Sequence, residues 1–216
     1  MQRTMQKQRG FTLTEMAIVV VLGGILLGAG LMAGRGQISR AQAQDIIQIA
    51  GDLQTASASF KQRYGYLPGD WVYAAGVLPT ISVGGTGGTV GNGLITGTLV
   101  AATGLATAAS EIGQAPVQLY QAGLIGKLGT NAQMRLQSQF GPVHLAGAAA
   151  NTTAAYRNIT TGNPGVQNVI IFYNLPCEVV LDVDRALDDG VSTTGKVMTD
   201  VACTAGRTAL RTFVPL

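Results

Sequence analysis

A single carboxylate, Glu15, stands at the edge of a long apolar run. From Met16 to Gly34 no charged residue appears in nineteen positions, which is enough to cross the hydrocarbon core of a bilayer. An ionised carboxylate at such an edge costs on the order of a few kcal/mol unless it finds a partner. The chemistry available to Glu15 is therefore ion pairing with a cation or, alternatively, solvation at the depth of the lipid headgroups.

The residues before Glu15 place a basic segment and a small residue ahead of the apolar run. Arg3, Lys7 and Arg9 precede Gly10, and no acidic residue lies among them. A secretory signal peptide has the opposite order, because its cleavage site follows a shorter apolar region, which is then discarded. A cut at Gly10 would instead keep the apolar run in the mature chain. The alternative interpretation is an ordinary signal anchor.

The segment Gly10-Phe11-Thr12-Leu13-Thr14-Glu15 resembles the prepilin signal of type IV pilins and type II secretion pseudopilins. Thr14 departs from the family, which more often has an aliphatic residue there. The resemblance implies cleavage by a prepilin peptidase between Gly10 and Phe11, followed by N-methylation of Phe11. It also implies that Glu15 pairs with the Phe11 amine of a neighbouring subunit and sets the axial register during assembly.

The net positive charge of the chain comes from the leader, residues 1–10. The chain has 14 Lys and Arg against 11 Asp and Glu, and three of the positive residues precede Gly10. The positive-inside rule then predicts an inner-membrane precursor with a cytoplasmic N-terminus and a periplasmic C-terminus, which becomes a cell-surface filament after assembly. The balanced remainder argues against a broadly electrostatic nucleic-acid partner.

A long helix over residues 11–64 must position these groups. Residues 11–36 form its expected transmembrane and filament-core half, where spacings such as Gly24 to Gly28 either permit close helix packing or are ordinary membrane-helix glycines. Over 37–64 apolar residues recur at three- and four-residue steps, which predicts an amphipathic half packed on a soluble domain; they are Ile46, Ile49, Leu53, Ala56 and Phe60. Gly65 and the following Pro68-Gly69 turn are expected to end the helix.

The remaining residues, 65–216, predict a head domain that gives the chain an α+β, pilin-like fold with a C-terminal antiparallel β-sheet. Residues 74–115 are rich in Gly and Thr and predict a surface loop. A short helix is expected over Pro116–Lys127, with the proline in its first turn. Val169–Tyr173 and Lys196–Ala202 predict strands, and the segment 177–190 between them predicts a short helix ended by Gly190.

Cys177 and Cys203 are the only cysteines of the chain. The topology above places them in an oxidising compartment, so we expect them to form a disulfide that bounds the region 177–203. Closing a loop of this length stabilises a fold by about 3.5 kcal/mol in the chain-entropy model. Two free buried thiols are the alternative.

Other groups carry less chemistry. The acidic residues Asp182, Asp184, Asp188 and Asp189 do not have EF-hand spacing, and a solvated helix face that pairs with Arg185 is the favoured interpretation over a calcium site. We therefore expect no metal and no cofactor. His144 is the only histidine, and catalytic motifs are missing from the sequence, so an enzyme is not expected.

The sequence thus predicts a structural subunit of a type IV pilus-like filament, a homo-oligomer joined through its N-terminal helices. The resemblance implies that pilus or secretion assembly machinery handles it, together with the prepilin peptidase and the inner membrane. Two alternatives stay open. One is a type II secretion pseudopilin, and the other is a minor tip pilin that acts as a binding module.

Overall fold

The computed structural model describes residues 12–71, 91–100, 102–147 and 165–216, and it leaves the side chains of 30–35 undescribed. The leader, Phe11 and much of the Gly/Thr-rich loop therefore lie outside the described residues. The chain divides into two units, 1–40 and 41–216.

The first element is one helix, α1 (Leu13–Tyr64), as the sequence predicts. Within the part of the chain that the structure describes, no helix has both the length and the hydropathy that a membrane-spanning helix needs. In the second unit, α1 buries Ile46, Leu53, Ala56 and Phe60 in the core, while Ile49 is partly buried. The helix ends at the expected place, where Gly65 adopts φ +81° and donates its N–H to the Lys61 carbonyl at 2.8 Å.

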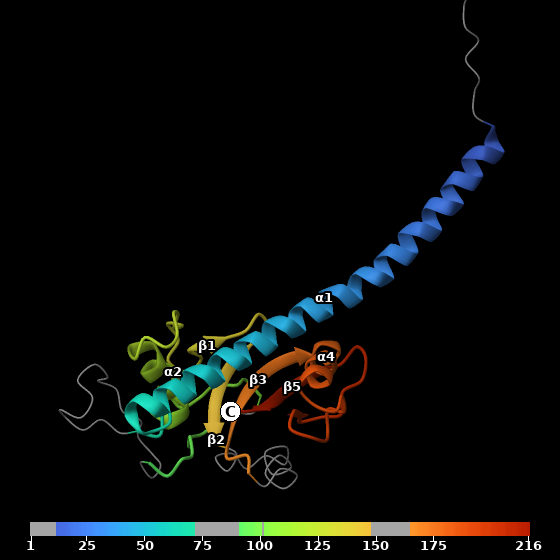
Figure 1. The fold of residues 1–216 in the computed structure, drawn as a ribbon. Helices are drawn as coiled ribbons and strands as arrows, with labels where there is room; N and C mark the ends of the chain where they lie inside the picture. Colours follow the sequence, from blue (N-terminus) through green and yellow to red (C-terminus); the bar gives the residue numbers. More distant parts are fainter. Residues whose placement is uncertain (1–11, 72–90, 101, 148–164) are drawn as a thin grey trace, which may run out of the picture. The chain divides into compact units, whose positions relative to one another are not determined.

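An antiparallel sheet of five strands forms the centre of the second unit, in the order β1-β2-β3-β5-β4 (Figure 1). The strands are β1 (Leu136–Gln137), β2 (Pro142–Gly147), β3 (Asn168–Pro176), β4 (Met198–Thr199) and β5 (Thr208–Pro215). β3 contains the predicted strand Val169–Tyr173, whose residues are all buried. The α+β fold predicted from the sequence is therefore confirmed, with α1 and the sheet sharing one core.

The predicted strand Lys196–Ala202 is reduced to the two residues of β4. On its N-terminal side, the backbone N–H groups of Lys196 and Val197 donate to the Asp188 carboxylate instead of a neighbouring strand. On its C-terminal side, the Thr199 hydroxyl donates to the Val201 carbonyl at 2.5 Å. Side-chain hydrogen bonds of this kind compete with strand pairing, so the ladder stops at both ends.

The second helix, α2 (Glu111–Gln121), begins five residues earlier than predicted and ends before Lys127. Ser110 caps it by accepting the Gly113 N–H at 3.3 Å, and the Glu111 carboxylate accepts the N–H and hydroxyl of Thr96 at 2.6 Å each. Pro116 consequently lies inside the helix and not in its first turn. The Gly/Thr-rich loop therefore ends at Ser110, and the prediction that it runs to residue 115 was wrong.

The turn after α1 is fastened to α2 and to residues 91–93. Gly69 donates its N–H to the Gln118 side chain at 2.6 Å, and it adopts φ +90° where a Cβ would lie 2.4 Å from the Glu111 carbonyl oxygen. The buried Asp70 carboxylate accepts the N–H groups of Gly91 and Gly93 at 2.9 and 2.8 Å. Hydrogen bonds to α2 and to residues 91–93 therefore hold the turn in place.

His144 lies buried on β2, where its Nε2 is 2.7 Å from the Gly104 carbonyl oxygen. A carbonyl oxygen only accepts hydrogen bonds, so Nε2 carries the proton and the ring can remain neutral. Burial lowers the pKa of His144 from 6.5 to about 4. A neutral, packed histidine on an inner strand is a structural residue, and it gives the domain a pH dependence.

We expect the free energy of unfolding to fall as the pH is lowered from 6.5 towards 4. In that range unfolded His144 binds a proton that folded His144 excludes, so stability is present above the unfolded pKa and decreases by about 3 kcal/mol through the window. Denaturant titrations of the full chain in detergent would measure it, with His144→Gln as the comparison. Burial raises the pKa values of the Asp70 and Glu111 carboxyl groups, so these two groups favour the folded state as the pH falls. They oppose the His144 effect in both the original chain and the variant. Equal pH slopes in the two proteins would contradict the assignment.

Candidate functional site

Thr12 and Glu15 form a reciprocal cap at the start of α1. The Thr12 N–H and hydroxyl each donate to Glu15 Oε2 at 2.9 Å, and the Glu15 N–H donates to Thr12 Oγ1 at 3.3 Å. This is the capping box that a Thr-x-x-Glu sequence forms. Glu15 is therefore used within its own chain, while no hydrogen bond to its Oε1 occurs among the described residues.

An unusually apolar surface follows the cap. Between Leu13 and Leu27, ten large hydrophobic side chains are more than half exposed, with Leu13 at 92% and Leu27 at 72%. The others are Met16, Ile18, Val19, Val20, Val21, Leu22, Ile25 and Leu26. Consecutive positions are exposed, so apolar groups surround the helix instead of forming one stripe. A helix that is apolar on all sides requires a nonaqueous or protein environment that a single chain in water does not provide.

Small residues interrupt this apolar surface. A Cβ placed on Gly23, Gly24 or Gly28 would meet no heavy atom within 4 Å, apart from the helix backbone and chain neighbours. Among the described residues, then, no neighbouring atom requires glycine at these positions. Their known physical effect in apolar helices is to let a second backbone approach closely. The geometry is compatible with both interpretations given above for these glycines.

The disulfide between Cys177 and Cys203 is present, with 26 residues of sequence separation and 5.1 Å between the two Cα atoms. Cys177 begins the helix α4 (Cys177–Leu187), which comes directly after β3. The Cys177 N–H donates to the Arg207 carbonyl at 2.9 Å. The disulfide thus ties the start of α4 to the segment between β4 and β5.

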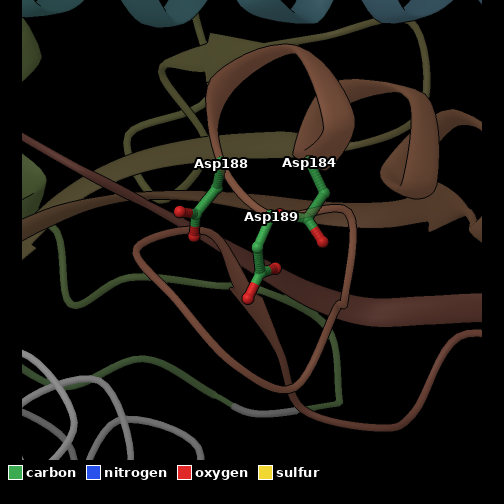
Figure 2. Close-up of side chains that lie close together, drawn as sticks. All are labelled: Asp184, Asp188 and Asp189. Carbon is green, nitrogen blue, oxygen red and sulfur yellow. The ribbon is translucent and has the colours of Figure 1, made fainter.

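Acidic side chains gather where α4 ends (Figure 2). Asp184 lies in the last turn of α4, Asp188 is the C-terminal cap, and Asp189 follows it. One carboxylate oxygen from each lies within 4.8 Å of those of the other two. Figure 2 shows the Asp184 and Asp189 carboxylates on the same side of the turn.

The four acids singled out in the sequence have three different roles. Asp182 pairs with Arg185 at 3.0 Å, as the favoured interpretation holds. Asp188 and Asp189 are instead turn-forming residues: Asp188 accepts from Lys196 and Val197, and Asp189 accepts the Val191 N–H at 2.8 Å and the Thr194 hydroxyl at 2.7 Å. The sequence also predicted that Arg185 pairs with Asp188 and Asp189, but no such ion pair occurs among the residues described.

Asp184 differs from its neighbours because it is fully buried. Neither of its carboxylate oxygens has a hydrogen-bond partner that meets normal geometry within the described chain. Burial first, then the nearby charges of Asp189 and Asp188, raise the pKa of Asp184 to about 6, and the Gly190 N–H only partly offsets them. Only one oxygen from each of the three carboxylates converges here, and Asp188 and Asp189 already accept hydrogen bonds within the turn, so we propose no metal site.

Replacing Asp184 by Asn should stabilise the domain at pH 7. The folded pKa of about 6 exceeds the ordinary 3.8, so the charged form costs stability above pH 6 and this cost disappears as the pH falls towards 3.8. We expect a gain of up to about 3 kcal/mol in the free energy of unfolding at pH 7 and almost none near pH 4. Denaturant titrations at both pH values would measure it, with Asp182→Asn as the exposed control. A loss of stability at pH 7 would contradict the prediction.

The comparisons with known proteins agree with the N-terminal geometry. Residues 5–31 match the prokaryotic N-terminal methylation motif. Over 101 residues the chain is 34% identical to the fimbrial protein EcpC of Eikenella corrodens, and the matched region covers 44% of this chain and 64% of that protein. Over 95 residues it is 34% identical to the type IV major pilin protein PilE of Neisseria gonorrhoeae, which covers 43% of this chain and 56% of that protein.

These matches have a limited extent, because the chain spans less than two thirds of the length of either relative. No solved structure gives a significant match to it. Within that extent, the chain carries the methylation motif and is homologous to both relatives.

Proposed function

From this motif and this homology, we propose that the chain is a structural subunit of a type IV pilus-like filament, polymerised through its N-terminal helix. The observation that carries the proposal is the apolar surface of α1, where ten large hydrophobic side chains between Leu13 and Leu27 stay exposed within and after the Glu15 cap. Burial of apolar surface contributes about 25 cal/mol per Å². Packing such helices against one another in a filament core supplies the environment that a single chain lacks.

Processing precedes assembly in this proposal. A prepilin peptidase cuts after Gly10, Phe11 becomes the methylated N-terminus, and the precursor resides in the inner membrane with its second unit in the periplasm. Both residues lie in the methylation motif but outside the described part of the structure. Assembly machinery then moves subunits into a surface filament, where neighbouring copies are the main partners.

A non-enzymatic role is consistent with the relatives, which are named as a fimbrial protein and a major pilin. Those names also favour a pilus subunit over the pseudopilin alternative. Three of the titratable groups have structural contacts that agree with the same proposal, since His144 is buried in the sheet and Asp188 and Asp189 hold a turn.

Intact-mass analysis and N-terminal sequencing of filaments sheared from cells would test the proposal. We expect an abundant species that starts at Phe11 and carries one added methyl group. The same processed species confined to the cell envelope would favour a pseudopilin or a minor subunit. An uncut start at Met1 in assembled filaments would overturn the proposed processing.

A further inference from the structure

An apolar recess lies at the β1 edge of the sheet, in the second unit. Ile49 and Leu53 of α1, Leu136 of β1 and Val143 of β2 line it, and its volume is about 250 Å³. We call it the β1-edge recess. The recess lies beside β1. In the strand order of the described sheet, β1 is an outermost strand because it pairs only with β2.

Two cationic side chains, Lys127 and Arg135, also line the recess, together with Gly129 and Gln137. Neither takes part in any of the ion pairs found among the described residues. The Nε atom of Arg135 is buried without a hydrogen-bond partner there. Lys127 is exposed and Arg135 is half-buried, so the recess carries positive charge beside its apolar residues. It would suit an occupant that combines apolar groups with negative charge.

The opposite end of the same sheet presents a segment of that chemistry. We call residues Leu187–Val191, which lead from α4 towards the edge strand β4, the acidic loop. Its apolar side chains Leu187 and Val191 are 41% and 49% exposed, and Asp188 and Asp189 lie between them. The nearby Asp184 carboxylate adds to the negative charge. The bond between Cys177 and Cys203 fastens the region on which this loop is built.

We propose that the acidic loop of one copy of this chain docks in the β1-edge recess of the next copy. The apolar side chains at the two ends of the loop cover the recess. The carboxylates of Asp188 and Asp189 stay hydrogen-bonded within their own turn, and their negative charge lies opposite Lys127 and Arg135. Complementary charge of this kind fixes orientation and register between partners. The inference rests on the proposed filament function and specifies one lateral contact of that assembly.

The arrangement of the two surfaces favours a filament over a closed pair. The loop and the recess are different patches at opposite edges of one sheet, next to β4 and β1 respectively. A contact between different patches is heterologous, and each copy keeps one unused surface of each kind. Such contacts continue as a ring or as an open helix.

Charge reversal in the recess tests the proposal without disturbing the loop. Asp188 and Asp189 hold their own turn, so they are left unchanged. The full-length double variant Lys127→Glu/Arg135→Glu should lower the yield of sheared filaments at least about tenfold, since like charges then meet across the contact. The matched control Lys127→Arg/Arg135→Lys should stay within about twofold of the original chain. Equal amounts of oxidised subunit in the membrane would exclude a folding defect.

Photo-cross-linking identifies the contact directly. A benzophenone amino acid at position 187 should give cross-linked dimers in filaments, with peptides that map to residues 127–143 of the second copy. The same probe at Tyr120, which is exposed on α2, should not reach this segment. Cross-links from position 187 to other segments, or full filament yield from the charge-reversed variant, would overturn the proposal.

Two further outcomes are distinguishable from these. If the unmodified chain forms no filaments, the proposed function itself fails, and this contact fails with it. If native mass spectrometry finds an anionic amphiphile bound to the original chain and lost from a charge-reversed variant that still assembles, the recess is a small-molecule site, and the docking proposal is wrong.

Discussion

Replacing Glu15 by Leu should leave a processed subunit in the membrane that does not form filaments. Both hydrogen bonds from Thr12 go to Oε2 of Glu15, and Oε1 accepts none among the described residues. In the proposed filament, Oε1 would accept from the Phe11 amine of a neighbouring subunit. Leucine removes the carboxylate and leaves that amine unpaired among apolar side chains. Leaving one partner of a buried ion pair uncompensated costs about 3–5 kcal/mol. The cost recurs at every subunit, and we expect filament yield below detection.

A second variant separates assembly from helix capping. Thr12→Ala removes the capping partner but keeps the Glu15 carboxylate, and the loss of a cap costs about 1 kcal/mol. We therefore expect Thr12→Ala to assemble close to normally. Quantitative immunoblots of sheared and membrane fractions would measure both variants. Normal filament yield from Glu15→Leu would refute the pairing role, and equal defects in the two variants would assign Glu15 to capping alone.

The long helix is predictable because its signals are local and repeated. Ile46, Leu53 and Phe60 follow the helical period, and all are buried. Gly65 is predictable as the end of α1 because few other residues adopt its positive φ without strain. The Thr12–Glu15 cap was also visible in the sequence as Thr-x-x-Glu, but the predicted roles of Glu15, ion pairing or solvation, did not include a cap.

Boundaries set by distant contacts were not predictable in the same way. α2 starts at Glu111 because Ser110 caps it and Thr96, fifteen residues earlier, holds the Glu111 carboxylate. Proline at position 116 was the stronger local signal, and it was misleading. β4 is short because Asp188 takes the backbone N–H groups that a longer strand would use.

The acidic residues show the same limit at the candidate site. Sequence spacing predicted one solvated helix face for Asp182, Asp184, Asp188 and Asp189. Only Asp182 fits that interpretation, since burial isolates Asp184 and the turn engages the other two. Likewise, Lys127 and Arg135 lie in one recess because the fold brings them beside Leu53, and no sequence motif marks that contact. Burial and packing decide these roles, and neither is encoded in the local spacing.

Removing the disulfide should cost about 3.5 kcal/mol of stability, because the unfolded chain then gains the entropy of an open loop across 26 residues of sequence separation. Cys177→Ala/Cys203→Ala is the suitable variant, since serine would bury a hydroxyl at the fully buried position 177. Denaturant titrations of the full chain would measure the loss, and reduction of the unmodified chain should reproduce it. A change below about 0.5 kcal/mol would contradict the chain-entropy account.

The same variant links stability to assembly. α4 and the acidic loop lie between the two cysteines, so opening the bond frees the segment that presents Leu187 and Val191. A loop that must be ordered on docking binds more weakly than one that is already fixed. We therefore expect filament yield from Cys177→Ala/Cys203→Ala to fall further than its membrane level. Equal decreases in both fractions would mean that the bond serves folding alone.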